Sequence, residues 1–325
     1  MNVAVTETAT LDEIEATRAE VRIIMTEEGL TQADIAREAG IPYGTFTPFM
    51  GGTYKGDNAG IAVKVRRWLE TRRERKRTHA VLPVAPVFVE TPTALNIIEI
   101  MSFAQVAPDM GVVVGGAGLG KTTAIEKYRK ENSNVFVVTA EPCLSTPNNM
   151  LSAIADELGV IERRNAFLSR AIVNRLRGAG ALLVIDEAQH LSSQALDQLR
   201  TIHDKARCGV IVAGNESVFA RLQGGETKGA QFAQLHSRVG MRIVQAQPRA
   251  KDICALIAAW GIDGKSEEAA LLKVIARKPG ALRGLTKVVR VASMLASGVG
   301  EPLAAGHIRR AWAQLSSSSS LDEAA

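Results

Sequence analysis

The stretch from Gly111 to Thr123, GVVVGGAGLGKTT, constrains the fold of this chain more than any other. It contains the pattern G-x-x-x-x-G-K-[ST], which begins at Gly115 and ends at Thr122. Glycine lets a backbone wrap closely around phosphate oxygens, and the N-terminus of a following helix attracts anions. A glycine-rich hairpin loop is the alternative, but a β-branched run precedes this stretch and a helix-like one follows it. The motif therefore predicts a phosphate-binding loop formed by Gly115, Gly116, Ala117, Gly118, Leu119, Gly120, Lys121, Thr122 and Thr123.

A second motif further along the chain fits the same chemistry. The apolar run from Leu182 to Ile185 is followed directly by Asp186 and Glu187. A buried strand that ends in an acid places a carboxylate at the edge of a sheet, beside the phosphate loop. We expect Lys121 to reach the β- and γ-phosphates of ATP, Thr122 and Asp186 to hold Mg²⁺, and Glu187 to act as general base toward water. An acidic helix cap at the end of a strand is the simpler alternative.

Three further polar residues are candidates for sensing the nucleotide. Asn215 ends the apolar run of GVIVAGNE, where an amide can orient the attacking water, although a turn asparagine is a serious competitor. Arg238 in LHSRVG and Arg283 in GALRGLTK can stabilise transition-state charge on a γ-phosphate. Each arginine taken singly would more often form a surface ion pair. Glu187, Asn215 and Arg238 are the expected catalytic residues, and Arg283 is expected to bind the nucleotide.

The pattern of apolar residues divides the chain into several parts. Short β-branched runs at 112–114, 135–139, 181–185, 210–213 and 243–244 alternate with helical segments, which predicts a parallel sheet wrapped by helices. After Pro248 the pattern is helical, which predicts a small bundle. We therefore expect an N-terminal domain at 1–78, a linker at 79–92, an α/β core at 93–247, a helical lid at 248–315 and a disordered tail at 316–325.

The N-terminal domain has the pattern of a helix-turn-helix. Thr31 and Asp34 can form a capping box for one short helix, Gly40 can turn the chain, and a second helix is expected at 43–50. This second helix would enter the major groove of DNA in repressor-like domains. It carries no Arg, Lys, Asn or Gln, and Pro48 removes a backbone donor. The sequence therefore favours the fold more than base-specific reading by it.

Charge is unevenly distributed along the chain. The net charge is +5, but residues 63–80 hold 8 Lys/Arg against 2 Asp/Glu, whereas residues 1–62 hold 4 against 10. Such a basic segment suits a polyanion such as nucleic acid, or else forms a solvated helix face. We find no signal-peptide pattern, no apolar run near the ~20 residues that span a bilayer, and no close pair among the three cysteines. A reducing bacterial cytoplasm without membrane attachment is the expected location.

The order of these motifs resembles that of AAA+ ATPases: phosphate loop, Asp-Glu strand, asparagine sensor, arginine finger and a lid with a sensor arginine. The segments GAGLGKT, LLVIDEAQHL, GVIVAGNESVF, FAQLHSRVG and KPGALRGLTKVVRVA further resemble the transposition protein B family of Mu-like phages, which is related to the ATPases of Tn7-like elements. The resemblance covers roughly residues 12–315 and includes RRWLE, the proline linker and FVET. It implies an AAA+ P-loop NTPase with a parallel sheet and a C-terminal helical lid, preceded by a small all-α helix-turn-helix domain.

The resemblance also implies a function. Members of this family bind ATP and Mg²⁺, form helical filaments on double-stranded DNA with little sequence preference, and take part in target immunity. They deliver the DNA as target to the transposase and activate strand transfer, while DNA and transposase stimulate ATP hydrolysis. Arg238 would act in trans on the nucleotide of a neighbouring subunit. The expected partners are therefore double-stranded DNA, a transposase and further copies of this chain, without a membrane.

A set of arginines is the expected DNA contact. Arg163, Arg170 and Arg177 are spaced by seven, so that they would share one face of a helix, with Arg164 and Arg175 close to it. A basic stripe of this kind would follow the phosphate backbone and give sequence-tolerant, salt-dependent affinity. A solvated amphipathic face is the alternative. The basic residues at 72–77 and those of the lid are further candidates.

Two other functions stay open at this point. An AAA+ loader or a secretion-type ATPase would share the ATPase motifs but would act on a helicase or a membrane complex. A repressor-like regulator with a nucleotide-sensing domain would share the helix-turn-helix. The missing membrane segment argues against the secretion form, and the poor recognition helix argues against the regulator.

Overall fold

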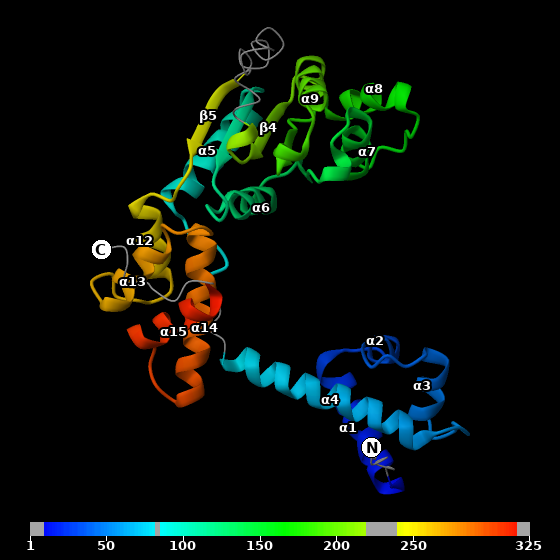
Figure 1. The fold of residues 1–325 in the computed structure, drawn as a ribbon. Coiled ribbons are helices and arrows are strands. Elements are labelled where there is room, and N and C mark those ends of the chain that lie inside the picture. The colour runs from blue at the N-terminus through cyan, green and yellow to red at the C-terminus, as the bar shows by residue number, and fades with distance from the viewer. Residues whose placement is uncertain (1–9, 82–84, 219–238, 317–325) are drawn as a thin grey trace, which may run out of the picture. The chain divides into compact units, whose positions relative to one another are not determined.

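The structure is a computed structural model that describes residues 10–81, 85–218 and 239–316 (Figure 1). It divides into two compact units between residues 83 and 84. Within the described residues, the first unit is helical, and the second combines a parallel sheet with a helical bundle. No helix in these described ranges has both the length and the hydropathy needed to cross a membrane.

The first unit is built from four described helices around its own core. Threonine caps begin the first two helices, because the hydroxyls of Thr10 and Thr31 accept hydrogen bonds from the backbone N–H groups three residues later. Gly40 adopts a φ of 66° between the second and third helices. The helices are α1 (Leu11–Glu28), α2 (Gln32–Glu38), α3 (Tyr43–Met50) and α4 (Asn58–Val81). Their fully buried side chains include Val21, Ile35, Phe46, Phe49 and Val65.

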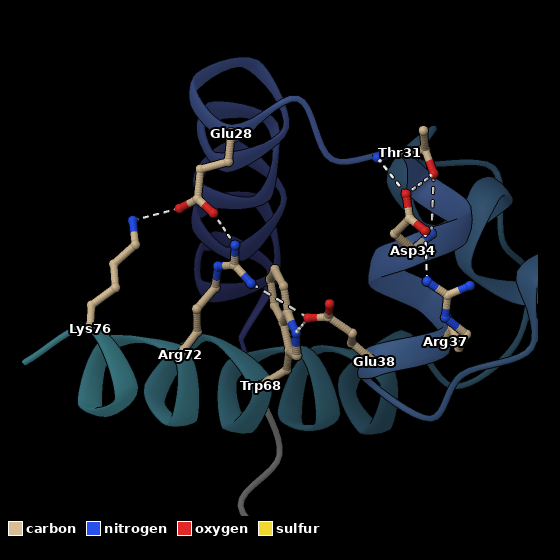
Figure 2. Close-up of polar contacts among 8 residues, drawn as sticks. All are labelled: Glu28, Thr31, Asp34, Arg37, Glu38, Trp68, Arg72 and Lys76. Atoms are coloured by element: carbon tan, nitrogen blue, oxygen red, sulfur yellow. Dashed lines mark hydrogen bonds and ion pairs between the residues drawn. The ribbon is translucent and has the colours of Figure 1, made fainter. Parts of the chain in front are cut away.

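Ion pairs join the C-terminal half of α4 to α1 and α2 (Figure 2). The Arg72 guanidinium contacts both Glu28 at the end of α1 and Glu38 at the end of α2. Lys76 also pairs with Glu28, and the Trp68 indole N–H donates to Glu38 at 2.9 Å. α4 continues to Val81 and so contains the whole basic segment at 63–80. Part of the basic segment therefore holds the N-terminal helices together.

A five-stranded parallel sheet forms the centre of the second unit. Its strand order is β2-β3-β4-β1-β5, so β4 lies between the strand that leads into the phosphate loop and the strand that ends in Asp186. β1, β3 and β4 are buried along their whole length, which explains their continuous apolar sequences. The strands are β1 (Met110–Gly115), β2 (Val135–Thr139), β3 (Leu182–Asp186), β4 (Gly209–Gly214) and β5 (Val239–Gln245).

Helices cover both faces of this sheet, as the fold class predicted. Alternate strand residues divide between two cores: Val112 and Leu183 belong to one, and Val113 and Leu182 to the other. The first core is closed by α7 (Pro147–Glu157), α8 (Asn165–Leu176) and α9 (Ser193–Ala206). The second core is closed by α5 (Pro92–Val106) and α6 (Lys121–Glu131). Because all strands are parallel, their carboxyl ends and the loops that follow them lie at one edge of the sheet.

The last four helices form a bundle with a separate core. They are α12 (Ala250–Ala259), α13 (Glu267–Ile275), α14 (Ala281–Val299) and α15 (Ala305–Leu315). The fully buried Asp252 carboxylate joins this bundle to the sheet domain. It accepts hydrogen bonds from the backbone N–H of Arg249 at 2.8 Å and from the N–H and hydroxyl of Thr93 at 2.9 and 2.6 Å. One side chain thus caps both α12 and α5.

Candidate nucleotide-binding site

The phosphate loop connects β1 to α6. β1 ends at Gly115, and α6 begins at Lys121. Gly118 and Gly120 have φ values of 81° and 89°, a conformation that is strained for residues with a Cβ. The Lys121 ammonium donates to the carbonyls of Gly115 at 2.8 Å and Gly116 at 3.1 Å, so it lies over the loop. The loop therefore has the backbone shape and the cation that a phosphate chain requires.

Burial and neighbouring charges act together on the Lys121 ammonium. Burial lowers the pKa of Lys121, and Arg283 adds to this effect, whereas the carboxylates of Glu187 and Asp186 oppose it. Two acids and a second cation thus act on the ammonium of Lys121. An anionic ligand that replaced the loop carbonyls around Lys121 would strengthen the ammonium form.

Thr122 and Asp186 lie next to each other, as their expected roles require. The Thr122 hydroxyl donates to an Asp186 carboxylate oxygen at 2.7 Å, and Asp186 is 1% exposed at the end of β3. Mg²⁺ prefers oxygen ligands and commonly takes one or two from the protein and the rest from phosphates and water. No cluster of three metal-ligating acids, histidines or cysteines exists in the described part of the chain. This pair therefore fits a phosphate-bound magnesium ion, and a stand-alone metal centre is not present among the described residues.

Glu187 occupies an unusual backbone conformation beside this pair. Its φ of 53° places it in the left-handed region, which costs about 1–3 kcal/mol for a residue with a side chain. Its carboxylate accepts a hydrogen bond from the Gln189 side-chain amide. The side-chain oxygen of Gln189 in turn accepts a hydrogen bond from the backbone N–H of Asn215 at 3.3 Å. The turn after β3 is thus held to the end of β4, with the Glu187 side chain in the cavity described below.

Asn215 combines a local structural role with a place in the site. Its side-chain oxygen accepts hydrogen bonds from the backbone N–H of Ser217 at 3.0 Å and from the Ser217 hydroxyl at 2.7 Å. This is the turn-forming role that the sequence left open as an alternative. Asn215 also lines the same cavity as Glu187. Asn215 is therefore positioned both to form the turn and to face a ligand in the cavity.

The lid closes over the phosphate loop through α14. The Gly280 carbonyl lies so near Gly118 that a Cβ on Gly118 would be 2.1 Å from the oxygen. The same Cβ would lie 3.2 Å from the Cβ of Arg283. Arg283 lines the cavity together with Lys287 and Arg290, which follow on the same helix face. The lid therefore adds positive charge next to the phosphate loop.

One cavity of about 520 Å³ gathers these groups from distant parts of the sequence. Its polar wall holds the phosphate loop from Ala117 to Thr123, and also Glu187, Asn215 and Arg283. Its apolar wall comes from five residues that the sequence did not indicate, since three lie in a proline-rich segment without periodicity and two have the pattern of ordinary core positions of the lid helices. These are Val87, Phe88, Val89, Leu256 and Leu282. An apolar wall beside a phosphate loop suits the base of a nucleotide.

Three of the expected catalytic and binding residues do not line the cavity as the structure describes it. Arg238 lies outside the described residues. Asp186 does not line the cavity itself but lies buried beneath it, bonded to Thr122. The remaining predicted nucleotide ligands lie at the cavity, apart from Gly116, whose missing Cβ would be 2.2 Å from the Ala246 carbonyl oxygen.

The expected arginine stripe on a single helix face is wrong. α8 begins at Asn165 and ends at Leu176, so Arg163 and Arg164 precede it and Arg177 is its C-cap in an extended conformation. The Glu162 carboxylate accepts the backbone N–H groups of Arg163 and Arg164, which holds this segment in a loop. Only Arg170 and Arg175 lie within the helix.

The five arginines also differ in how their charges are used. Arg163 pairs with Asp156 at 2.9 Å, and Arg164 pairs with Glu162 at 2.8 Å, which lowers the pKa of Glu162 to about 2. Arg175 lies over the ring of Phe136, and Arg177 donates to the Lys205 carbonyl. Arg170 is exposed and makes no ion pair with a described residue. It is therefore the most available cation of the set.

The chain matches two protein families. Residues 106–222 match an AAA domain, which contains the phosphate loop, Asp186, Glu187 and Asn215 and makes this an ATPase domain. Residues 237–315 match the family described as "Mu B transposition protein, C terminal". Among solved structures, a variant of Thermotoga maritima RuvB is 19% identical, with a TM-score of 0.45 over 71% of each chain.

Curated relatives match nearly the whole chain. The "ATP-dependent target DNA activator B" of Escherichia phage Mu is 38% identical over 302 residues, which are 92% of this chain and 94% of the relative. The "Mu-like prophage FluMu DNA transposition protein B" of Haemophilus influenzae is 35% identical over 81% of this chain and 91% of the relative. This chain therefore belongs to the Mu transposition protein B family.

Proposed function

We propose that this chain is an ATP-dependent DNA-binding protein that assembles as a filament on double-stranded DNA and delivers it as target to a transposase. The observation that carries the proposal is the cavity that joins the phosphate loop, Glu187 and Arg283 of the lid, with Asp186 bonded to Thr122 beside it. A ligand there touches both the sheet domain and the bundle, so its γ-phosphate can set their relative position. The name of the phage Mu relative, "ATP-dependent target DNA activator B", agrees with such a coupling.

The residues of the cavity have complementary roles in ATP hydrolysis. The loop amides, Lys121 and Arg283 bind and neutralise the phosphate chain, most strongly as charge develops on the oxygen that leaves. Glu187 accepts the proton of the water that attacks the γ-phosphorus, and its Gln189 contact holds the carboxylate in place. Thr122 and Asp186 would hold Mg²⁺, which would supply charge neutralisation for the phosphate chain. Phe88 and Leu282 exclude water from the base.

Assembly provides the remaining part of this proposal. Arg238 of one subunit acts on the nucleotide of its neighbour, so that ATP at a subunit interface favours the filament. Hydrolysis, stimulated by DNA and the transposase, removes the γ-phosphate and with it the contact that joins the subunits. ATP thus serves as the assembly signal, and its hydrolysis serves as the release step.

We propose that DNA contacts the α8 region, chiefly through Arg170 and Arg175 and less through the other three arginines. Arg170 and Arg175 stay on the helix and exposed, whereas Arg163 and Arg164 share their charge with Asp156 and Glu162. Arg177 is fixed at the end of the helix by its bond to the Lys205 carbonyl. We expect phosphate contacts without base reading, and hence affinity that falls steeply with salt.

Negative-stain microscopy with plasmid DNA of unrelated sequences, with and without ATP, tests the proposal. Filaments on every plasmid that need ATP are the expected result. Binding restricted to particular sites would favour the repressor-like regulator, and no binding at all would favour the AAA+ loader. A strand-transfer assay with the cognate transposase then asks whether DNA coated by the protein becomes the preferred target.

A further inference from the structure

α4 of the N-terminal unit divides its basic residues between two sides. On the inner side, Arg72 and Lys76 pair with carboxylates of α1 and α2, as Figure 2 shows, and Arg73 pairs with Glu20 of α1. The Arg72 guanidinium also lies 5.4 Å from the centre of the Trp68 ring. These cations are part of the domain's packing. Their positions and hydrogen bonds are fixed before any ligand arrives.

The outer side of α4 carries cations of a different kind. Lys64, Arg67 and Arg75 are exposed and make no ion pair with any residue that the structure describes. Together with Thr71 they follow one another at intervals of three or four residues, which places them on one face of the helix. From Lys64 to Arg75 this face extends ~16 Å along the helix axis.

This face forms one wall of a groove of about 650 Å³ between α4 and the end of α2. The groove is lined by Glu38, Ala39, Lys64, Arg67, Trp68, Thr71, Arg72, Arg75 and Lys76. Glu38 is the one acid among these lining residues, and it is already engaged by the Trp68 indole N–H and by Arg72. Of the five cations that line the groove, Arg72 and Lys76 are paired with carboxylates of α1 and α2, which leaves Lys64, Arg67 and Arg75 for a ligand.

The neighbouring helix α3 offers no comparable surface. Its sequence, YGTFTPFM, contains no charged or amide side chain, and Phe46 and Phe49 are buried in the core. Base edges in the major groove are read mainly by arginine, lysine, asparagine, glutamine and acidic side chains, and also by serine and threonine. α3 therefore lacks the charged and amide groups that make bidentate contacts with bases and offers only hydroxyls, although it occupies the position of a recognition helix in the sequence.

We propose that the N-terminal unit binds the phosphodiester backbone of double-stranded DNA along the outer face of α4, independently of ATP. Duplex DNA presents one phosphate per strand every ~3.4 Å, so a stripe of ~16 Å reaches several phosphates in turn. The arginine forks and the Thr71 hydroxyl are suitable donors to phosphate oxygens. A membrane surface fits poorly because the apolar lining of the groove consists of Ala39 and of Trp68, which is 8% exposed.

Such a site would hold DNA weakly in any register and would raise its local concentration for the ATP-dependent domain. The contact of α4 with DNA would not need ATP, whereas the contact of the ATPase domain with DNA would, so the two can be measured separately. The Lys121→Ala background removes the proposed ammonium contact with ATP and leaves the N-terminal unit unchanged. A failure of ATP-dependent filaments would overturn the proposed function and would leave this inference standing.

The test measures fluorescence anisotropy of a labelled duplex with full-length Lys121→Ala protein, without nucleotide, between 50 and 200 mM salt. The test variant adds Arg67→Gln and Arg75→Gln. The control variant adds Arg37→Gln and Lys55→Gln, two exposed cations of the same unit outside the groove, of which Arg37 pairs with Asp34. Loss of two phosphate contacts should reduce the slope of log affinity against log salt by about 2, or about tenfold over this salt range. The control pair should keep most of the slope.

Three results would overturn the inference. Lys121→Ala protein without measurable DNA binding at 50 mM salt is the first, and equal losses in the test and control pairs is the second. The third is displacement of DNA by polyglutamate at equal charge concentration, which would indicate an acidic protein as the partner. Circular dichroism melting of each variant establishes that the helices remain folded, since glutamine retains a helix propensity close to that of arginine.

Discussion

The contact between the phosphate loop and the lid leads to a prediction about a single methyl group. Gly118 and Gly120 both have positive φ values, 81° and 89°, so alanine at either position is strained. Their surroundings differ. A Cβ on Gly118 would be 2.1 Å from the Gly280 carbonyl oxygen, whereas a Cβ on Gly120 would meet no heavy atom within 4 Å.

The expected magnitudes follow from these two terms. Alanine in the left-handed conformation costs about 1–2 kcal/mol, and this term applies to both variants. Real Cβ contacts essentially never fall below 3.0 Å, so in Gly118→Ala the loop and the backbone at Gly280 must separate by nearly an ångström. Backbone atoms on both sides cannot rotate away, and overpacking of this kind costs about 1–3 kcal/mol more. We therefore expect Gly120→Ala to lose about 1–2 kcal/mol and Gly118→Ala about 2–5 kcal/mol.

Urea unfolding without nucleotide measures this difference directly. Two of the three tryptophans, Trp260 and Trp312, lie in or beside the bundle that contains Gly280, so their fluorescence reports on the lid. Because no nucleotide is present, a collision of the new methyl group with phosphate oxygens cannot contribute to the measured loss in free energy of unfolding. ATP binding measured afterwards should be weakened in both variants.

Equal destabilisation of the two variants would refute the reasoning. It would mean that the phosphate loop and Gly280 do not approach as closely as the structure has them, and that strain alone limits these positions. Gly116→Ala provides an internal control, because its φ is not in the left-handed region while its Cβ would be 2.2 Å from the Ala246 carbonyl. It should lose stability through the collision alone.

Other expectations concern catalysis, DNA and thiol chemistry. Lys121→Ala should abolish ATP binding and filaments, measured by nucleotide filter binding and microscopy. Glu187→Gln should instead bind ATP and give long-lived filaments with little phosphate release; failure to bind DNA while still binding ATP would contradict its role as general base. Arg170→Gln should lower the salt slope of ATP-dependent DNA affinity by about 1, with unchanged ATP affinity, and more than Arg164→Gln, whose guanidinium is held by Glu162. An aromatic disulfide reagent at pH 8 should modify the exposed Cys143 and Cys254 before urea is added, whereas burial raises the pKa of Cys208 to about 11 and should delay its reaction until unfolding.

Much of the sheet domain could be predicted because its signals are local. The continuous apolar runs at Val112 to Val114 and Leu182 to Ile185 indicate strands that are buried on both faces. The edge strand β5 was harder, because its residues alternate between partly buried and exposed. The sequence indicated only residues 243–244 of a strand that extends from Val239 to Gln245.

The parts that could not be predicted depend on contacts between distant residues. A spacing of seven indicates a shared helix face only if the helix is continuous, and Glu162 holds Arg163 and Arg164 in a loop instead. The pairing of Arg72 with Glu28 joins residues 44 positions apart and has no periodic signal. Placement of Phe88 and Leu282 on one cavity wall likewise follows from the arrangement of the lid on the sheet domain.

The Asp252 carboxylate has a consequence for how the lid can respond to its ligand. Because it caps α5 and α12 together, the first lid helix is pinned to the ATPase core at that end. Positive φ values recur at Gly261, just after α12, and at Gly280 and Ala281, where α14 begins two residues before Arg283. We therefore expect α12 to keep its position on the ATPase core and the chain to bend at residues 280–281. Loss of the γ-phosphate would then move α14, with Arg283, Lys287 and Arg290, relative to α12.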